Sequence, residues 1–509
     1  MSSDDDRLTP VEVAVSRARR RRLLILALLV LGIGYYLLFV NQYVLAFENE
    51  TEHFLHGSIG SEVATGPPYW VFKALPVMYK DRLGGEGYRR FGFLYQTPDA
   101  DLPIGVSRRV VSGVERVWLN CSVCHVGTYR LPGESERHMI PGAPSNNLRL
   151  QELITFLIDV GRDPGFNADA LIAAINGDEV GGDLNVFERA IYRHVVFPRV
   201  KNAFLDLGRR LTFVSRQEPW GPGRVDTFNP YKAIQFNFPM GPENISGAAL
   251  NGSSDYPAIW QQRPREGMNL HWDGNNDSVA ERNLSAALGA GVTPVTVDRR
   301  SIGRIERWMR DLQPPRFPAA DQIDRTRAAE GEHLFTRYCA ECHGQRGPNG
   351  YDYDTNRYPR LGKVEPLAEI GTDPGRWASY TDNFVAAQSL LYAGYPWRFQ
   401  RFHKTEGYAN HPLDGIWARS PYLHNGSVPT LRDLLEPSSR RPVVWYRGSD
   451  ELDLRRVGYR TDAATPGGSL FRYDTSRPGN ANTGHEGPRY GTDLPASAKD
   501  ALIEYMKTL

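Results

Sequence analysis

All four cysteines of the chain lie in two segments that share one pattern, in which two cysteines are separated by two residues and followed directly by a histidine. The first segment contains Cys121, Cys124 and His125, and the second contains Cys339, Cys342 and His343. Two thiols at this spacing can add across the two vinyl groups of one haem, and the adjoining imidazole can then bind the iron. The pattern therefore predicts two covalently bound c-type haems, each with the histidine of its own segment as an iron ligand.

Other sites that use a Cys-x-x-Cys pair explain these segments less well. A disulfide or a redox dithiol does not need the histidine that follows each pair, and a zinc site needs four ligands in one cluster. The two pairs lie more than two hundred residues apart, and no cysteine is left over to complete a zinc cluster. Haem attachment remains the interpretation that uses every residue of the pattern.

The composition limits the classes of protein that fit. The 60 basic and 59 acidic residues give a formal charge of +1, so there is no overall electrostatic attraction to nucleic acid. A length of 509 residues and a hydrophobic share of 41% predict two domains of ordinary size and an appendage. The 49 glycines and 36 prolines indicate long ordered loops, which are expected where a chain wraps a large flat cofactor.

The appendage is predicted at the amino terminus. Residues 23–40 form an uncharged stretch of 18 residues, long enough to cross a hydrocarbon layer, and a run of arginines precedes it. We therefore expect a cytoplasmic basic tail over residues 1–22, a transmembrane anchor over residues 23–40, and a single-pass protein of the inner membrane with its bulk in the periplasm. A cleaved signal peptide is the alternative, but residues 44–47 fit a cleavage site poorly. A buried core helix is a third reading, which the arginine run and terminal position disfavour.

An amphipathic helix is predicted at the end of each half of the chain. Residues 301–312 carry an apolar stripe that stops at Pro314 and Pro315, and residues 496–509 carry a similar stripe. This layout is typical of a small cytochrome c domain used twice. We predict a mainly α fold with two cytochrome c-like haem domains, residues 55–313 and 316–509, which have long ordered loops and follow one N-terminal transmembrane helix.

A second correspondence supports the duplication. An Ile-Trp pair ending at Trp260 precedes the run His271-Trp-Asp-Gly-Asn275, and an Ile-Trp pair ending at Trp417 precedes Leu423-His-Asn-Gly-Ser427. A helix is expected after each run, with Asn283 and Thr430 as candidate N-caps.

Two segments of the second half resemble known families. The run Ser420-Pro-Tyr-Leu-His-Asn-Gly-Ser427 resembles the Ala-Pro-Tyr-Phe-His-Asp-Gly run of the dihaem cytochrome c peroxidase superfamily. The run Pro478-Gly-Asn-Ala-Asn-Thr-Gly-His485-Glu is similar to the rubber oxygenases within that superfamily. The resemblance covers both predicted haem domains, roughly residues 55–509. It implies a dihaem c-type cytochrome, and an activity that is either peroxidase-like or dioxygenase-like.

The resemblance also implies a second iron ligand for the haem of His343. In dihaem peroxidases this ligand is a methionine shortly before the Pro-Tyr-Phe-His run, but residues 405–413 contain no methionine. The rubber oxygenase pattern implies His485 instead, and His403, His411 and His424 are rival candidates by position. Ligation by two imidazoles saturates the iron, so a haem held by His343 and His485 would relay electrons.

Catalysis, if present, is then expected at the haem of His125, where the catalytic residues stay unknown. Candidates for the far face of this haem are His271 and Trp272, followed by Met240, His138 and Met139. A peroxidase would also need an acid or base near the iron, and Glu266 and Glu281 are close in sequence. An oxygenase would need an apolar pocket, which residues 231–240 could line, although ordinary core is the simpler reading. Arg224 could pair with a haem propionate or serve a structural turn, and no calcium-binding loop stands out.

Three functions remain open at this point. The first is an oxidoreductase with one relay haem and one reactive haem, whose partner is a redox protein or a small oxidant, peroxide or dioxygen. The second is a pure electron carrier in which both irons are six-coordinate. The third is a binding protein that merely retains haems. In each case we expect the anchor to contact the inner membrane and no nucleic acid to bind.

Overall fold

The computed structural model describes residues 10–36, 43–462 and 470–509, with 42% of the chain in helices and 12% in strands. The longer helices are α1 (Pro10–Tyr35), α4 (Tyr69–Met78), α5 (Leu150–Arg162), α8 (Phe197–Arg210), α11 (Val279–Gly289), α12 (Arg299–Met309), α13 (Arg325–Tyr338) and α19 (Ala496–Met506). The shorter helices are α2 (Glu50–His56), α3 (Ser61–Ala64), α6 (Ala168–Ile175), α7 (Val186–Ile191), α9 (Phe228–Gln235), α10 (Gly247–Leu250), α14 (Ala340–His343), α15 (Leu367–Ile370), α16 (Gly375–Ser379), α17 (Asp382–Leu390) and α18 (Leu431–Leu434).

The strands are short, and all of their pairings are antiparallel. One sheet has three strands, β1 (Tyr43–Val44), β2 (Val106–Val111) and β3 (Val114–Leu119). The two-stranded pairs are β4 (Val126–Tyr129) with β5 (His138–Pro141), β6 (Arg224–Asp226) with β7 (Ser253–Asp255), β8 (Gln345–Gly347) with β9 (Gly350–Asp352), β10 (Val364–Pro366) with β11 (Gly407–Ala409), β12 (Val444–Arg447) with β15 (Phe471–Asp474), and β13 (Leu452–Asp453) with β14 (Gly458–Tyr459). Short two-stranded pairs therefore connect the expected long loops at intervals, and in β6–β7, β10–β11 and β12–β15 they join segments that lie far apart in the chain.

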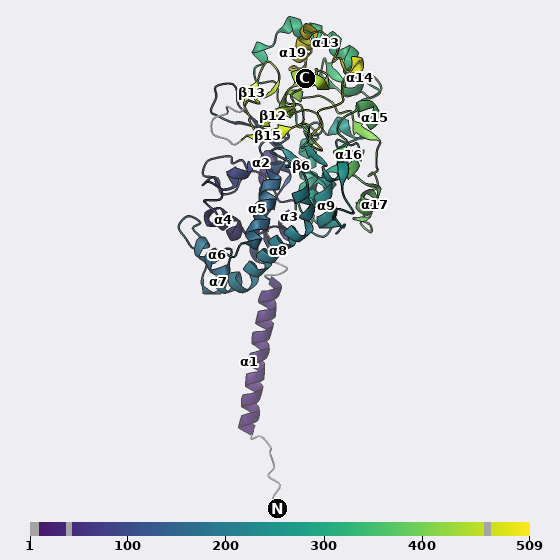
Figure 1. Ribbon diagram of the computed structural model, residues 1–509. Helices are drawn as coiled ribbons and strands as arrows, with labels where there is room; N and C mark the ends of the chain where they lie inside the picture. Colours follow the sequence, from purple (N-terminus) through teal and green to yellow (C-terminus); the bar gives the residue numbers. More distant parts are fainter. Residues whose placement is uncertain (1–9, 37–42, 463–469) are drawn as a thin grey trace, which may run out of the picture.

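The predicted fold class is wrong in its transmembrane helix. Among residues 10–36, 43–462 and 470–509, no helix is both long enough and apolar enough to cross a membrane. Helix α1 stands apart from the rest of the chain (Figure 1), but the uncharged part that the structure describes runs only from Leu23 to Tyr35. At about 1.5 Å per residue this part is about 20 Å long, against about 30 Å of hydrocarbon. The single-pass inner-membrane location that rested on the anchor is wrong as well; residues 1–9 and 37–40 lie outside the described residues.

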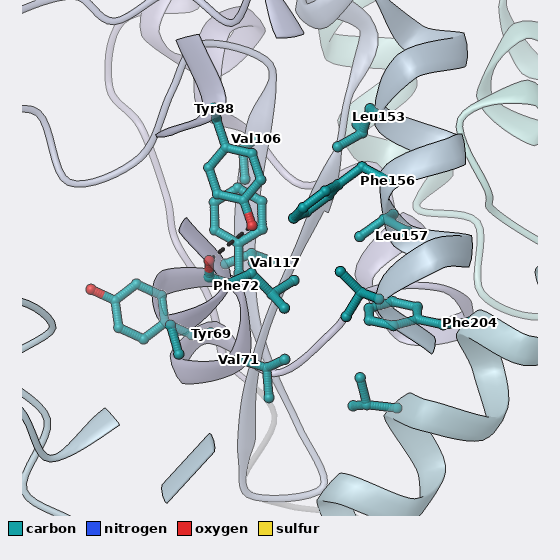
Figure 2. Packing of buried hydrophobic residues seen from close by; sticks show 14 of the residues in the cluster. Tyr69, Val71, Phe72, Tyr88, Val106, Val117, Leu153, Phe156, Leu157 and Phe204 are labelled. Carbon is teal, nitrogen blue, oxygen red and sulfur yellow. Dashed lines mark hydrogen bonds between the residues drawn. The ribbon is translucent and has the colours of Figure 1, made fainter. Parts of the chain in front are cut away.

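The first hydrophobic core fixes the wall behind the first cysteine segment. Figure 2 shows α4 and α5 packing around strands β2 and β3, with the rings of Phe72 and Tyr88 stacked at 4.1 Å between centroids. The Tyr88 hydroxyl donates to the carbonyl oxygen of Phe72 at 2.8 Å, so its buried oxygen is satisfied. Val123 belongs to this core and Cys124 packs against it. The core therefore positions the first Cys-x-x-Cys turn.

Two further cores join residues from both predicted domains. One combines Phe228 and Tyr231 of α9 with Tyr380, Phe384 and other residues of the second half, and Cys121 packs against it. Figure 1 shows the same arrangement at the level of the chain, with α16 and α17 beside α9. Another core combines Trp260 with residues of α13 and α19. The domain limits at residues 313 and 316 stay a prediction, and the hydrophobic packing crosses them.

The second cysteine segment is held by the packing of α13 on α19. A Cβ atom added to Gly331 would lie 2.0 Å from the carbonyl oxygen of Ala501, so only a residue without a side chain allows this approach. Phe335, fully buried one turn later, lies against Tyr505 with 5.0 Å between ring centroids. The helices predicted at the ends of the two halves are α12 and α19, and both are present. Helix α12 begins after its side-chain cap Asp298 and ends before Pro314, and α19 is the last helix in chain order.

The predicted repeat of a polar turn is confirmed in its backbone. In the first copy Leu270 and Asn276 form a bridge, and in the second copy Tyr422 and Val428 form the corresponding bridge. The glycine of each turn donates to the carbonyl oxygen three residues earlier, at 3.2 Å for Gly274 and 3.1 Å for Gly426. Both glycines have positive φ, where a side chain would be strained.

The two candidate helix caps have different outcomes. Thr430 caps α18 through its side chain, as predicted. The prediction for Asn283 is wrong, because Ser278 caps α11 and Asn283 lies inside that helix.

Candidate haem sites

The second Cys-x-x-Cys-His segment occupies a single helical turn at the end of α13. The amide of Cys339 donates to Phe335, and the amide of His343 donates to the carbonyl oxygen of Cys339 at 3.0 Å. This turn brings Cys339, Cys342 and His343 to the wall of one cavity of about 410 Å³. Neither cysteine is in a disulfide. The volume lies in the range of pockets that enclose small molecules and cofactors, about 300–1,000 Å³.

His485 lies across this cavity from His343. Their ring centroids are 6.3 Å apart, and the rings are inclined by 45°. Two imidazoles that bind one ion from opposite sides have ring centres about 6 Å apart, because each metal–nitrogen bond is about 2 Å long and each ring centre lies about 1 Å behind its nitrogen. The separation of the two rings therefore fits an iron ion between them.

The His343 ring is held in the orientation that a proximal ligand needs. Its Nδ1 donates to the carbonyl oxygen of His411 at 2.7 Å, which leaves Nε2 as the nitrogen available to a metal. Burial lowers the pKa of His343, although the bond to His411 opposes the shift. The imidazole is therefore neutral at pH 7, which is the form that binds iron.

The loop that carries His485 is fixed by its backbone. His485 has a positive φ of 49°, and its amide donates to the carbonyl oxygen of Ile370 at 2.8 Å. The buried guanidinium of Arg441 donates to the carbonyl oxygens of Asn482, Gly484 and His485 and holds the loop from behind. Burial, His343 and Arg441 lower the pKa of His485 to about 3, so this ring is also neutral.

The rest of the cavity suits a haem by its chemistry. Leucines and Met506 supply apolar surface, and Arg337 supplies positive charge for a carboxylate. Arg419 and Arg489 also line the cavity but are paired with protein carboxylates. Several lining residues carry buried polar atoms that have no hydrogen-bond partner among the described residues: Thr372 Oγ1, Arg419 Nε, His424 Nε2 and Tyr490 Oη. The residues present therefore fit a covalently bound haem. We call Cys339, Cys342, His343 and His485 the second site.

The first Cys-x-x-Cys-His segment, called the first site, is built on a capped turn. Asn120 accepts from the amide of Ser122 at 3.0 Å, and its own amide group donates to the carbonyl oxygen of Gly57 at 3.0 Å. His125 Nδ1 donates to the carbonyl oxygen of Pro257 at 3.0 Å, which again leaves Nε2 for a metal. Burial and the nearby charge of Arg282 lower the pKa of His125 to about 4. The proximal histidines of the two sites thus have the same kind of support.

Within residues 10–36, 43–462 and 470–509, no second histidine ring faces His125 as His485 faces His343. Among the described residues, the one ring in contact with His125 belongs to Tyr256, with 6.3 Å between centroids. His271 Nδ1 bonds to Asn275 Oδ1 at 2.6 Å, and its ring lies beside Phe402. Trp272 lines the cavity of the second site, and its Nε1 donates to the carbonyl oxygen of Asp255 at 2.7 Å. The structure therefore brings Trp272 to the second site.

The other candidates from the sequence are occupied by structural contacts. His138 bonds to Glu134 and stacks on Tyr129, Met139 is partly exposed, and Met240 is buried in a separate small core. Glu266 accepts from the amide of Val279, and Glu281 accepts from the amides of Gln400 and Arg401. The guanidinium of Arg224 donates to Asn480 and to backbone carbonyls.

The rival ligands for the second site are also accounted for. His403 is exposed and bonds to Arg401, while His424 is buried and stacks on Tyr408. Residues 231–240 supply Tyr231, Phe236 and Phe238 to the aromatic core around Phe384.

Sequence reasoning missed the roles of Arg282 and of the His411 carbonyl. Arg282 is buried in α11, its Nε has no hydrogen-bond partner among the described residues, and its charge affects the pKa of both His125 and His271. It lies on the buried stripe of α11, and this periodicity could have drawn attention to it. No sequence signal identifies a backbone carbonyl as the partner of a proximal histidine.

Comparison with known proteins matches one part of the second site to a cytochrome family. Residues 407–446 match the family described as RoxA-like, cytochrome c-like. This segment contains His411, the second copy of the repeated turn and most of β12, and it forms one side of the second cavity. The match implies a c-type haem, suggests a c-type cytochrome oxidoreductase, and supports the resemblance to rubber-oxygenase-like cytochromes.

Two curated proteins of Sinorhizobium fredii (strain NBRC 101917 / NGR234) are similar to the chain over longer stretches. Uncharacterized protein y4iJ is 28% identical over 479 residues, which covers 77% of each chain. Uncharacterized protein y4iM is 31% identical over 304 residues, which covers 50% of this chain and 64% of that protein. The similarity therefore extends well beyond the segment that matches the cytochrome family.

Proposed function

We propose that the protein is a dihaem c-type cytochrome oxidoreductase with two unlike centres. In this proposal Cys339 and Cys342 bind one haem, and His343 and His485 ligate its iron from opposite sides. Cys121, Cys124 and His125 bind the other haem, which is the reactive one. The haems supply reversible one-electron chemistry at iron, and the chain supplies their attachment, orientation and shielding from water.

The observation that carries the proposal is the pair of neutral imidazoles facing each other across the second cavity. Their ring centroids are 6.3 Å apart, and both belong to a cavity that also contains the two thiols. Two imidazole ligands leave no position for a substrate, so the second site is suited to relay electrons. His125 has Tyr256 as its ring neighbour and no such opposing imidazole among the described residues. Reaction with a small molecule is therefore assigned to the first site.

The contacts of Trp272 support electron exchange between the two sites. Trp272 lines the second cavity and bonds to Asp255, and two residues further along the chain Pro257 accepts the bond from His125. One short segment therefore connects the proximal histidine of the first site to an aromatic ring of the second. We propose a redox protein as the electron partner and peroxide or dioxygen as the oxidant.

The hydrogen bonds of the two carboxylates considered for the first site favour dioxygen over peroxide as the oxidant. Cleavage of a peroxide bond is assisted by a free acid or base. The two candidates are already bonded to the backbone: Glu266 accepts from the amide of Val279 at the start of α11, and Glu281 accepts from the amides of Gln400 and Arg401. The core next to Cys121 is aromatic and apolar instead, and apolar surroundings suit a reaction of dioxygen with an apolar substrate. Dioxygen uptake and peroxide consumption, measured on the same preparation, separate the two activities.

The test of the proposal is His485→Ala in protein produced in a host that attaches c-type haem. The intact mass should show two haems in both the parent and the variant, because the cysteines are unchanged. The variant should convert one low-spin centre into a centre that binds cyanide. His138→Ala, which changes a histidine bonded to Glu134 outside both sites, is the matched control and should leave the spectrum unchanged. An unchanged low-spin signal in His485→Ala would refute the assignment, and two low-spin centres that ignore small ligands in the parent would favour the pure electron carrier.

A further inference from the structure

His411 lies at the junction of the two sites and makes contacts in both directions. Its backbone carbonyl accepts the bond from His343 Nδ1 at 2.7 Å. Its own ring nitrogen Nε2 donates to the carbonyl oxygen of His271 at 2.9 Å. Its ring also meets Trp272 edge to face, with 5.7 Å between centroids and 84° between planes. One residue therefore contacts the proximal ligand of the second site and the turn that carries two candidates for the first.

The bond from the ring fixes the state of this histidine. A carbonyl oxygen only accepts, so His411 must carry its hydrogen on Nε2. Burial and the nearby Arg265 lower the pKa of His411 to about 3, so the ring is neutral at pH 7. Its interaction with His271 is therefore a directed hydrogen bond, with one definite tautomer.

The segment around His411 clamps two consecutive carbonyl groups of the turn. The amide of Ala409, at the end of β11, donates to the carbonyl oxygen of Trp272 at 2.9 Å, while His411 donates to that of His271. The backbone amide of Asn410, which lies between them, donates instead to the carbonyl oxygen of Lys363 at 2.8 Å. The Ala409 bond is made by the backbone and is available to any residue. The His271 bond depends on a side chain that reaches this carbonyl.

We propose that His411 is a positioning residue that couples the two sites, by holding the His271–Trp272 turn with its ring while its carbonyl orients His343. The inference rests on the proposed function, because it gives the residue a role in electron exchange between two haem sites. Loss of the ring removes the bond to His271 and opens space beside Trp272, while the bonds from Ala409, Thr405 and His403 to other carbonyl groups of the turn remain. The position of Trp272 relative to the second cavity then becomes less well defined, and electron exchange between the sites slows.

The experiment compares two variants of similar size. His411→Leu removes the donor, and His411→Gln keeps an N–H group at a similar distance from the backbone. We expect His411→Leu to slow electron transfer between the two centres by about tenfold or more, because the variant keeps the carbonyl bond to His343 but lets the turn with Trp272 shift. His411→Gln should restore the rate to within about threefold of the parent. The rate is measured after rapid photochemical reduction of one centre.

His403→Ala is the matched control, because the exposed His403 side chain bonds to the carbonyl oxygen of its neighbour Arg401, and its backbone amide, which donates to Asn275, is kept in the variant. It should leave the rate unchanged. Two haems by intact mass and a low-spin second centre are required in every variant before rates are compared. If these conditions hold and His411→Leu matches the parent, or if His411→Gln is as slow as His411→Leu, the inference is wrong and the proposed function stands. If the parent itself carries fewer than two haems, the proposed function is wrong irrespective of His411.

Discussion

The two Cys-x-x-Cys-His segments have the same pattern and the same support for the proximal histidine, but they differ in what lies opposite. His125 and His343 both donate from Nδ1 to a backbone carbonyl, at 3.0 and 2.7 Å. His343 faces His485 across a cavity, whereas the ring beside His125 is that of Tyr256. The attachment motif thus predicts where a haem is bound and which histidine is proximal. The residues that decide what the haem can do come from distant loops.

The largest expected effect comes from removing one attachment pair at a time. Replacing Cys121 and Cys124 with serine should remove one haem from the intact mass and leave a low-spin centre that ignores cyanide. Replacing Cys339 and Cys342 should also remove one haem, but should leave the centre that binds cyanide. Identical spectra for the two double variants would mean that the sites do not differ as their surroundings indicate.

A smaller effect is expected from the packing that supports only the second site. In Gly331→Ala the new Cβ would lie 2.0 Å from the carbonyl oxygen of Ala501, so α13 and α19 must move apart. We expect the free energy of unfolding to fall by about 3 kcal/mol and the low-spin signal of the second site to weaken. Gly303→Ala in α12 is the control, because its Cβ would meet only Arg307 at 3.6 Å. Chemical unfolding followed by circular dichroism gives both values, and equal values would contradict the close approach.

The free energy of unfolding should fall as the pH is lowered, partly because His411 takes up a proton when the chain unfolds. The pKa of this residue is lowered to about 3, against about 6.5 in the unfolded chain. The unfolded chain therefore takes up the proton first as the pH falls, and the stabilisation present above pH 6.5 is lost progressively toward pH 3. Between pH 6.5 and 5 the loss is about 2 kcal/mol for one such residue. His411→Gln should show a shallower decline over this range in urea unfolding, and an equally steep decline would show that His411 is not the group that titrates.

The smallest effect is expected at the ring beside His125. The Tyr256 hydroxyl makes a long bond of 3.5 Å to the carbonyl oxygen of Arg224 and a side-chain contact with the Cys124 sulfur. Tyr256→Phe keeps the ring and should cost about 1 kcal/mol or less in unfolding free energy. The spectrum of the first centre should stay the same. A changed spectrum would indicate that the hydroxyl acts at the iron and would reduce the contrast between the sites.

The parts of the structure that follow from local pattern could be predicted from the sequence. The helices that end each half follow apolar stripes, and the repeated turn follows from the glycines of the two related runs. Residue type correctly predicts Thr430 as the N-cap of α18. It fails for Asn283, because Ser278 caps α11 about one turn earlier. The two- to four-residue strands of the two-stranded pairs are too short to show a period of two.

The remaining features depend on contacts between distant segments. The charged arginines within α1 leave too short an uncharged part among the described residues for the anchor that hydropathy suggested. His485 lies near His343 because Arg441 holds the loop that carries it. In the sequence, only the family resemblance points to His485. The acceptor for His343 is a backbone carbonyl, which every residue has, so no residue type marks His411 in advance.

The measurement that tests the central claim most directly is a carbon monoxide titration of the fully reduced protein after its intact mass has shown the number of haems. The account predicts a mass increase of two haems and the binding of one carbon monoxide per chain, at the centre of His125. Binding of two per chain, or of none, would contradict the claim that one iron is held between two imidazoles and the other is not.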